Sequence, residues 1–112
     1  MQTFASTLGQ AVWLMTMSKD HRDLPISSIE KNAATAIFLR HFKLYSKGKQ
    51  PIAFLTWASV SDEVKKRIES GNNVLELAEW RSGTNIVIID CVSPFGPTEV
   101  FEAKFLEDVS SL

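Results

Sequence analysis

Apolar residues recur at three- and four-residue steps near the start of the chain, and this spacing predicts an amphipathic helix. The positions that carry the pattern are Phe4, Leu8, Val12 and Met15. Thr3 or Ser6 is a suitable N-cap, because a short hydroxyl side chain can accept a hydrogen bond from a free N–H of the first turn. The helix should end before the polar link SKDHRDLP (18–25), and Gly9 within it suggests a close packing contact.

The next segments favour a second helix and then a β-hairpin. Pro25 is suited to the first position of a helix. The residues on the apolar face of that helix are Ile26, Ile29 and Ala33. The segment AIFLRHFKLYSKGKQPIAFLTWA (36–58) is typical of a hairpin, with a polar turn at 46–50 and a return strand at 52–57.

The second half of the chain mixes helix and strand signals. Ser61 is expected to cap a helix that stops at Gly71. VLELAEW (74–80) alternates apolar and polar residues, which favours a strand, with a short helix as the alternative. NIVIIDCV (85–92) is the strongest strand signal, and its apolar run is typical of the middle of a covered sheet. The positions that predict a final helix are Val100 or Phe101, Phe105, Val109 and Leu112. Together these elements predict an α+β fold with helices packed on a mostly antiparallel sheet.

Composition and charge narrow the class of protein. A length of 112 residues suits one domain, 1–112. The formal net charge of −1 gives no reason to expect nucleic acid or an anionic membrane as a partner. A single cysteine, Cys91, excludes an internal disulfide framework and favours a reducing compartment. The chain starts without a signal-peptide pattern and contains no apolar run long enough for a membrane span, so we expect a cytoplasmic protein.

Asp90 interrupts an apolar strand, where a carboxylate needs a partner because an unpaired buried charge is costly. One interpretation is structural, in which Asp90 caps a turn or meets a cation such as Arg81. The other pairs Asp90 with His21, so that the carboxylate holds one ring nitrogen and raises the basicity of the other. Cys91 should point to the opposite face of the strand, as a buried and inert thiol.

His21 lies in the polar link and belongs to the residue type that titrates near neutral pH. It is either a solvated link residue or a general base or nucleophile oriented by Asp90. His41 is expected at the edge of the core or on the surface. Two histidines and one cysteine do not form a zinc-binding pattern, and no glycine-rich phosphate loop occurs. The residues of a basic cluster, either a solvated face or a docking site for an acidic partner, are Lys47, Lys49, Lys65, Lys66 and Arg67.

Three separated blocks carry a recognisable set of motifs. They are LGQAVWLMTMSKDHRDLPI (8–26), QPIAFLTWASVS (50–61) and EWRSGTNIVIIDCVSPFG (79–96). The matching positions of the first block are Gly9, Trp13-Leu14, Ser18, His21-Arg22 and Pro25. The third block holds Trp-x-Ser-Gly, then Ile-Asp, then Pro-Phe-Gly. In order and approximate spacing, the three blocks resemble the toxin-activating lysine acyltransferases, the family that matures RTX haemolysins.

The resemblance implies a GNAT-like fold. It also implies transfer of a fatty acyl group from acyl-carrier protein to the ε-amine of internal lysines in an RTX-type protoxin, with no metal and no bound cofactor. The family's catalytic residues fall on His21 and Asp90, with Ser18 and Arg22 as supporting residues. Whether His21 acts as base or nucleophile stays open. The alternatives are a non-catalytic toxin- or carrier-binding protein on the same fold and, last, acetylation of a small amine by acetyl-coenzyme A.

The final segment, TEVFEAKFLEDVSSL (98–112), departs from the family pattern, which continues further. We therefore expect a C-terminally shortened version of the fold. Either the family's helix is kept and the strand after it is missing, or VFEAKFL (100–106) is itself the strand. In the first case a sheet edge would be open, and a homodimer could cover it.

Overall fold

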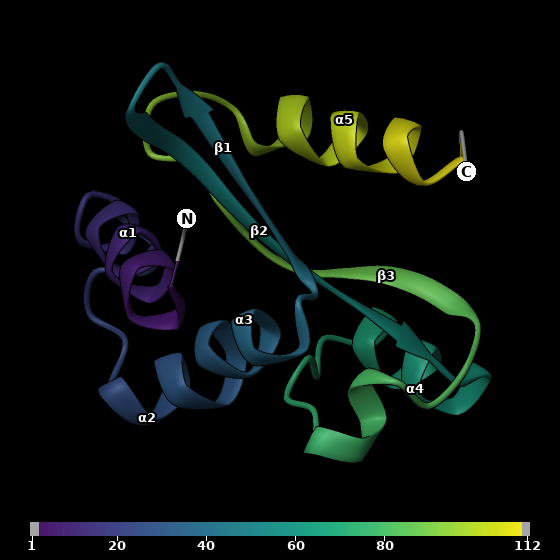
Figure 1. The fold of residues 1–112 in the computed structure, drawn as a ribbon. Coiled ribbons are helices and arrows are strands. Elements are labelled where there is room, and N and C mark those ends of the chain that lie inside the picture. Colours follow the sequence, from purple (N-terminus) through teal and green to yellow (C-terminus); the bar gives the residue numbers. More distant parts are fainter. Residues whose placement is uncertain (1–2, 111–112) are drawn as a thin grey trace.

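The chain folds as an α+β structure, as predicted, and the computed structural model describes residues 3–110. The helices are α1 (Phe4–Thr16), α2 (Ile26–Ile29), α3 (Thr35–Leu39), α4 (Asp62–Glu69) and α5 (Thr98–Ser110). A π-helical turn, η1 (Glu30–Ala34), joins α2 to α3, and a 3₁₀ turn, η2 (Leu77–Trp80), precedes the last strand. The strands β1 (Phe42–Lys47), β2 (Gln50–Val60) and β3 (Asn85–Val92) form an antiparallel sheet in the order β1-β2-β3 (Figure 1). None of the helices within residues 3–110 has the length and apolarity to cross a membrane.

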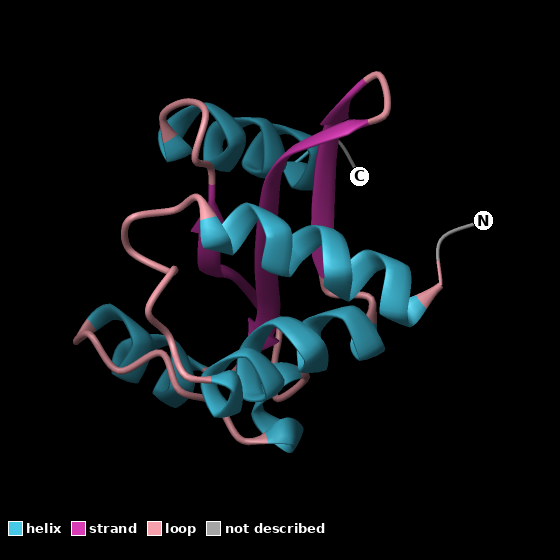
Figure 2. Cartoon of the chain, turned by 90° about the vertical axis from the view of Figure 1, so that its left-hand side faces the viewer, coloured by secondary structure: helices cyan, strands magenta, loops and turns pink. Residues whose placement is uncertain are grey.

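The sheet separates two layers of helices. On one face, Phe54 of β2 packs with α1 and η1–α3, and Val60 packs with α4. On the other face, Leu55 packs with Phe105 of α5. Figure 1 shows α5 on one side of the sheet and α3 on the other, and in Figure 2 α1 lies in front of the strands. In this arrangement the end of α1 packs against the last residues of β3. The GNAT-like arrangement and the single domain 1–112 stay predictions.

The first helix has the predicted start but a different buried face. Thr3 is the N-cap, and its hydroxyl accepts a hydrogen bond from the Ser6 N–H at 3.0 Å. The buried residues of α1 are Thr7, Ala11, Leu14 and Met15. Phe4, in the first turn, is 47% exposed, whereas Leu14 and Met15 near the other end of α1 are buried. The packing contact expected at Gly9 is wrong, since a Cβ there would meet nothing within 4 Å.

The segment after the link departs most from prediction. The helical run from Ile26 continues through η1 to Leu39, so the hairpin begins at Phe42 and not at position 36. Ala36 and Ile37 are both buried on the helix and extend its apolar face. The hairpin turn itself lies within the predicted range, at Gly48, whose φ of 64° is a left-handed conformation that glycine adopts without strain.

The strand favoured for residues 74–80 is wrong, and the helical alternative is correct. Glu76 and Glu79 form a reciprocal capping box around η2. Arg67 of α4 donates two hydrogen bonds to the Glu79 carboxylate, at 2.7 and 2.8 Å. These polar contacts hold a helical turn, with Trp80 buried at its end, where alternation alone suggested a strand.

The strand predicted from NIVIIDCV is confirmed as β3, but it is not in the middle of the sheet. Within the described part of the chain it pairs with β2 alone. Thr56 lies opposite Asp90 and Trp57 opposite Ile88, so Ile89 is one extra residue, a β-bulge. An extra residue changes which face the following side chains take, and the bulge therefore sets the direction of Asp90.

The chain after the Pro-Phe-Gly motif forms α5, so the predicted terminal helix is confirmed and a strand at 100–106 is wrong. Phe105 is 1% exposed and packs against Leu55 and Cys91. Phe101 packs on Tyr45 with a ring separation of 5.2 Å. Leu112, which was also expected to belong to this helix, lies outside the described residues.

Candidate active site

The link between α1 and α2 is a compact turn that fixes His21. The backbone N–H groups of His21 and Arg22 both donate to the Ser18 carbonyl, at 3.1 and 2.9 Å. The Leu24 N–H then donates to the His21 carbonyl at 3.1 Å. Because these bonds restrain the backbone on both sides, the imidazole keeps one direction, toward β3.

The structure brings three of the predicted site residues together. His21 Nε2 lies 3.0 and 2.9 Å from the two carboxylate oxygens of Asp90, 69 positions away in sequence. On the other side of the ring, Ser18 Oγ lies 2.6 Å from His21 Nδ1. The Cys91 N–H also donates to Asp90 Oδ1, at 2.9 Å. Ser18, His21 and Asp90 thus form one continuous chain of hydrogen bonds.

The chemistry of the three groups assigns the protons in that chain. An ionised carboxylate only accepts hydrogen bonds, so His21 Nε2 carries the ring proton and donates a hydrogen bond to Asp90. In a neutral imidazole the other nitrogen, Nδ1, is then the acceptor. The Ser18 hydroxyl therefore donates to Nδ1. This arrangement leaves Nδ1 as the basic nitrogen of His21.

The surroundings of His21 raise its pKa above the ordinary value of 6.5. The hydrogen bond to Asp90 is the main cause, and the negative charges of Asp90 and Asp20 add to it. Partial burial of the ring acts in the opposite direction. The imidazolium form is stabilised by folding, which is what a base that takes up a proton during a reaction requires.

We expect the raised pKa of His21 to be visible in a titration followed by NMR of the ring protons. Its midpoint should lie above 6.5. Because folding favours the protonated ring, the stability gained from His21 is complete below pH 6.5 and is lost as the pH rises through the folded-state pKa. The free-base form needed for catalysis follows the opposite trend and increases over the same range. A midpoint at or below 6.5 would contradict the Asp90 contact.

The His21–Asp90 pair opens onto a cleft of about 640 Å³. Its walls come from the link, from the helical run through η1, from residues 73–75 and from β3, and Glu102 of α5 lies at its border. Apolar residues such as Leu24 and Ile29 line it together with the polar pair. A cleft with this mixture of apolar walls and few polar groups is typical of a small-molecule or substrate site.

Asn32 is a site residue that sequence reasoning missed. It belongs to η1, lines the cleft, and its side-chain oxygen accepts a hydrogen bond from Thr56 Oγ1 at 3.2 Å. With the oxygen engaged, the two N–H donors of its amide are available to a ligand. No sequence pattern predicts a π-helical turn, although such turns often occur at functional sites.

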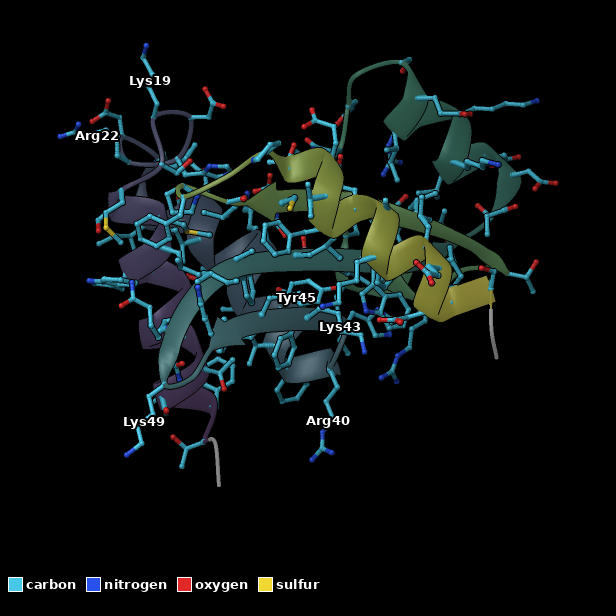
Figure 3. The ribbon with its side chains drawn as sticks, turned by 90° about the horizontal axis from the view of Figure 1, so that it is seen from above. Lys19, Arg22, Arg40, Lys43, Tyr45 and Lys49 are labelled. Atoms are coloured by element: carbon cyan, nitrogen blue, oxygen red, sulfur yellow. The ribbon has the colours of Figure 1, made fainter. Side chains whose placement is uncertain are left out.

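Arg22 and the predicted basic cluster are not part of the site that the structure forms. Arg22 is exposed and points outward from the turn (Figure 3), so it has no direct contact with the pair. The basic residues expected to form one cluster lie apart, because Lys47 and Lys49 flank the start of β2 and α4 follows its end. Those 11 residues of strand span roughly 30 Å. The prediction that these five residues form one basic cluster is therefore wrong.

Among the remaining candidates, the interpretation that pairs Asp90 with Arg81 is wrong, whereas His41 and Cys91 have structural roles. Arg81 does not meet Asp90; its Nε donates to His41 Nε2 at 3.4 Å and its Nη2 to the Leu39 carbonyl at 3.1 Å. His41 is buried and stacks on Trp57 with a ring separation of 4.1 Å. Cys91 points to the α5 side, and burial raises the pKa of its thiol to about 12. Such a thiol is a poor nucleophile at neutral pH.

The fold and site define an α+β domain with a carboxylate-oriented histidine at a cleft. The sequence profile of the RTX toxin acyltransferase family (HlyC) matches residues 1–110, and the chain belongs to this family.

The chain is also similar to several individual proteins. It is 34% identical over 95 residues to the RTX-II toxin-activating lysine-acyltransferase ApxIIC of Actinobacillus pleuropneumoniae, covering 85% of this chain and 59% of the relative. It is 33% identical over 91 residues to the protein-lysine myristoyltransferase RtxC of Kingella kingae, covering 81% and 54%. It is also 33% identical over 91 residues to an uncharacterised protein of Synechocystis, covering 80% and 62%. The matched segment thus spans little more than half the length of these relatives.

Proposed function

We propose that the chain transfers a fatty acyl group from a thioester donor, acyl-carrier protein, to the ε-amine of an internal lysine in an RTX-type protoxin. The observation that carries the proposal is the hydrogen-bonded Ser18–His21–Asp90 arrangement at the cleft of a chain from this family. The names of two relatives, a toxin-activating lysine-acyltransferase and a protein-lysine myristoyltransferase, support both the reaction and the acceptor.

The reaction requires a base. A lysine with a reference pKa near 10.4 is almost entirely protonated at neutral pH, and only the free amine attacks a thioester. His21 Nδ1 takes the proton, and Asp90 stabilises the imidazolium that results. After the amine has added to the carbonyl, the C–S bond breaks and the imidazolium returns a proton to the thiolate that leaves. The excess proton on the new amide nitrogen passes to solvent. We favour a base over a nucleophile because the Ser18 hydroxyl already occupies Nδ1, where it can pass a proton but blocks a carbonyl carbon.

Ser18 and Asn32 have supporting roles in this proposal. Ser18 aligns the His21 ring through its 2.6 Å contact, and its hydroxyl passes the proton between the substrate amine and Nδ1. Asn32 can donate its amide N–H groups to the oxygen that becomes negative when the amine adds to the carbonyl. Arg22 is kept as a supporting residue only through the link backbone, since its side chain points outward (Figure 3).

Partners and location belong to the same proposal. Lys65 and Lys66 of α4 are a candidate docking site for an acidic carrier protein. A homodimer that covers the outer edge of β3 and the cytoplasmic location stay predictions. Within residues 3–110 no group of three or more histidine, cysteine or acidic side chains is placed to hold a metal ion.

The competing function is binding of toxin or carrier without transfer. The intact His21–Asp90 pair favours the enzyme, because binding alone needs no oriented base. Intact-mass analysis of an RTX-type protoxin, incubated with the chain and fatty acyl-carrier protein, separates the two. We expect an acyl increment on a protoxin lysine that survives hydroxylamine, as an amide does. Complex formation with unmodified protoxin, from folded chain and intact donor, would support the binding protein and contradict the enzyme.

A further inference from the structure

One lysine of this chain shares the cleft with the His21–Asp90 pair. Lys31 lies in η1, next to Asn32, and both residues line the cleft. Lys31 is the only lysine among the described residues that lines the cleft. Lys31 therefore contributes to the same cleft as the proposed base, and its amine is an acceptor carried on the chain itself.

The charges of the cleft favour an ammonium group. Asp20 and Glu102 line it in addition to Asp90. Carboxylates arranged around a concave surface attract cations into it. Lys31 is exposed, and within residues 3–110 its ammonium group forms no ion pair. No ion pair within the described residues therefore holds its ammonium group away from the proposed base.

We propose that Lys31 is itself an acyl acceptor, so that the chain acylates its own cleft. This inference rests on the proposed acyltransferase function. An acceptor carried on the same chain is present at a high effective concentration, which favours its reaction over that of a dilute external amine. The acyl chain attached to Lys31 then lies against the apolar walls of the cleft, where it competes with the next donor.

The step balances without a further reactant. The Lys31 ammonium loses one proton, relayed by the Ser18 hydroxyl, to His21 Nδ1, and the free amine adds to the thioester carbonyl. The C–S bond breaks as the amide C–N bond forms, and the thiolate leaves with a proton from the imidazolium. The amine's remaining excess proton is released to solvent. One thioester and one lysine ammonium are consumed, and one amide, one thiol and one proton are formed.

The test incubates the full chain with fatty acyl-carrier protein in the absence of a protein acceptor, followed by intact-mass analysis and peptide mapping. We expect one acyl increment, resistant to hydroxylamine and located at Lys31. It should be absent from Lys31→Arg, which keeps the charge but offers no acylable amine, and from His21→Ala. The matched controls are Lys19→Arg and Lys49→Arg, which should retain the increment. Both side chains project outward from the ribbon (Figure 3), and neither residue lines the cleft.

The outcomes separate this inference from the proposed function. A protoxin that is acylated while Lys31 stays unmodified would overturn self-acylation and leave the acyltransferase function standing. Acylation of Lys31 that persists in His21→Ala, or that occurs equally at Lys19 and Lys49, would show uncatalysed chemistry and also overturn it. Absence of acyl transfer to both acceptors would overturn the two proposals together. A hydroxylamine-labile increment would assign the acyl group to an ester or thioester and not to Lys31.

Discussion

Asp90→Asn should lower the rate of acyl transfer by roughly 10⁴-fold, the size of the loss when the orienting carboxylate of a Ser-His-Asp triad becomes an amide. The Cys91 N–H already donates to Oδ1 of Asp90, so the amide oxygen of the substituted side chain would take that position. The amide nitrogen would then face His21 and donate to Nε2. The ring proton would move to Nδ1, and the base would lose the lone pair that it needs.

The substitution preserves shape, and its effect should be on chemistry and not on folding. The single-turnover rate should fall while the unfolding curve changes little, and the His21 titration midpoint should move downward. Asp23→Asn is the matched control, because Asp23 is an exposed carboxylate of the same link. A rate for Asp90→Asn within twofold of the wild type would remove Asp90 from the mechanism.

Phe105→Ala should reduce the free energy of unfolding by about 3–5 kcal/mol, the usual cost of truncating a fully buried phenylalanine. Phe105 is 1% exposed and holds α5 against Leu55 and Cys91. A domain of this size has a total stability of about 5–15 kcal/mol, so this change would leave the fold marginal. Urea unfolding of the variant and the wild type measures the effect.

The neighbouring residue on the same helix provides the control. Leu106 is 51% exposed, and Leu106→Ala should change the stability by less than about 0.5 kcal/mol. Equal losses for the two variants would mean that α5 is not docked through Phe105. That result would also remove one border of the cleft, because α5 carries Glu102.

Local sequence patterns predicted the elements whose signals are local. The Thr3 cap of α1, the Ser61 cap of α4 and the strand NIVIIDCV all follow from side chains that act within one turn or one strand. The central position expected for β3 failed for a physical reason. Helices cover both faces of the sheet, so β3 is apolar on both sides although within residues 3–110 it pairs along one edge only. Coverage of faces and pairing of edges are independent properties.

The candidate site was also only partly predictable from local sequence patterns. His21 and Asp90 were singled out separately, one as a titratable residue in a link and one as a charge in an apolar strand. Their contact spans 69 positions, and no periodicity encodes it; the motif resemblance suggested it. Asn32 could not be found, because the π-helical turn that directs it depends on packing between η1 and the sheet. The bulge at Ile89 depends on the β2 register in the same way.

The most direct test of the central claim is the single-turnover rate of acyl transfer to a lysine, measured for the wild type and for His21→Ala with and without added imidazole. The account predicts that the wild type forms the amide, that His21→Ala does not, and that imidazole partly restores the rate by supplying the missing base. A folded His21→Ala variant that transfers the acyl group at the wild-type rate would contradict it.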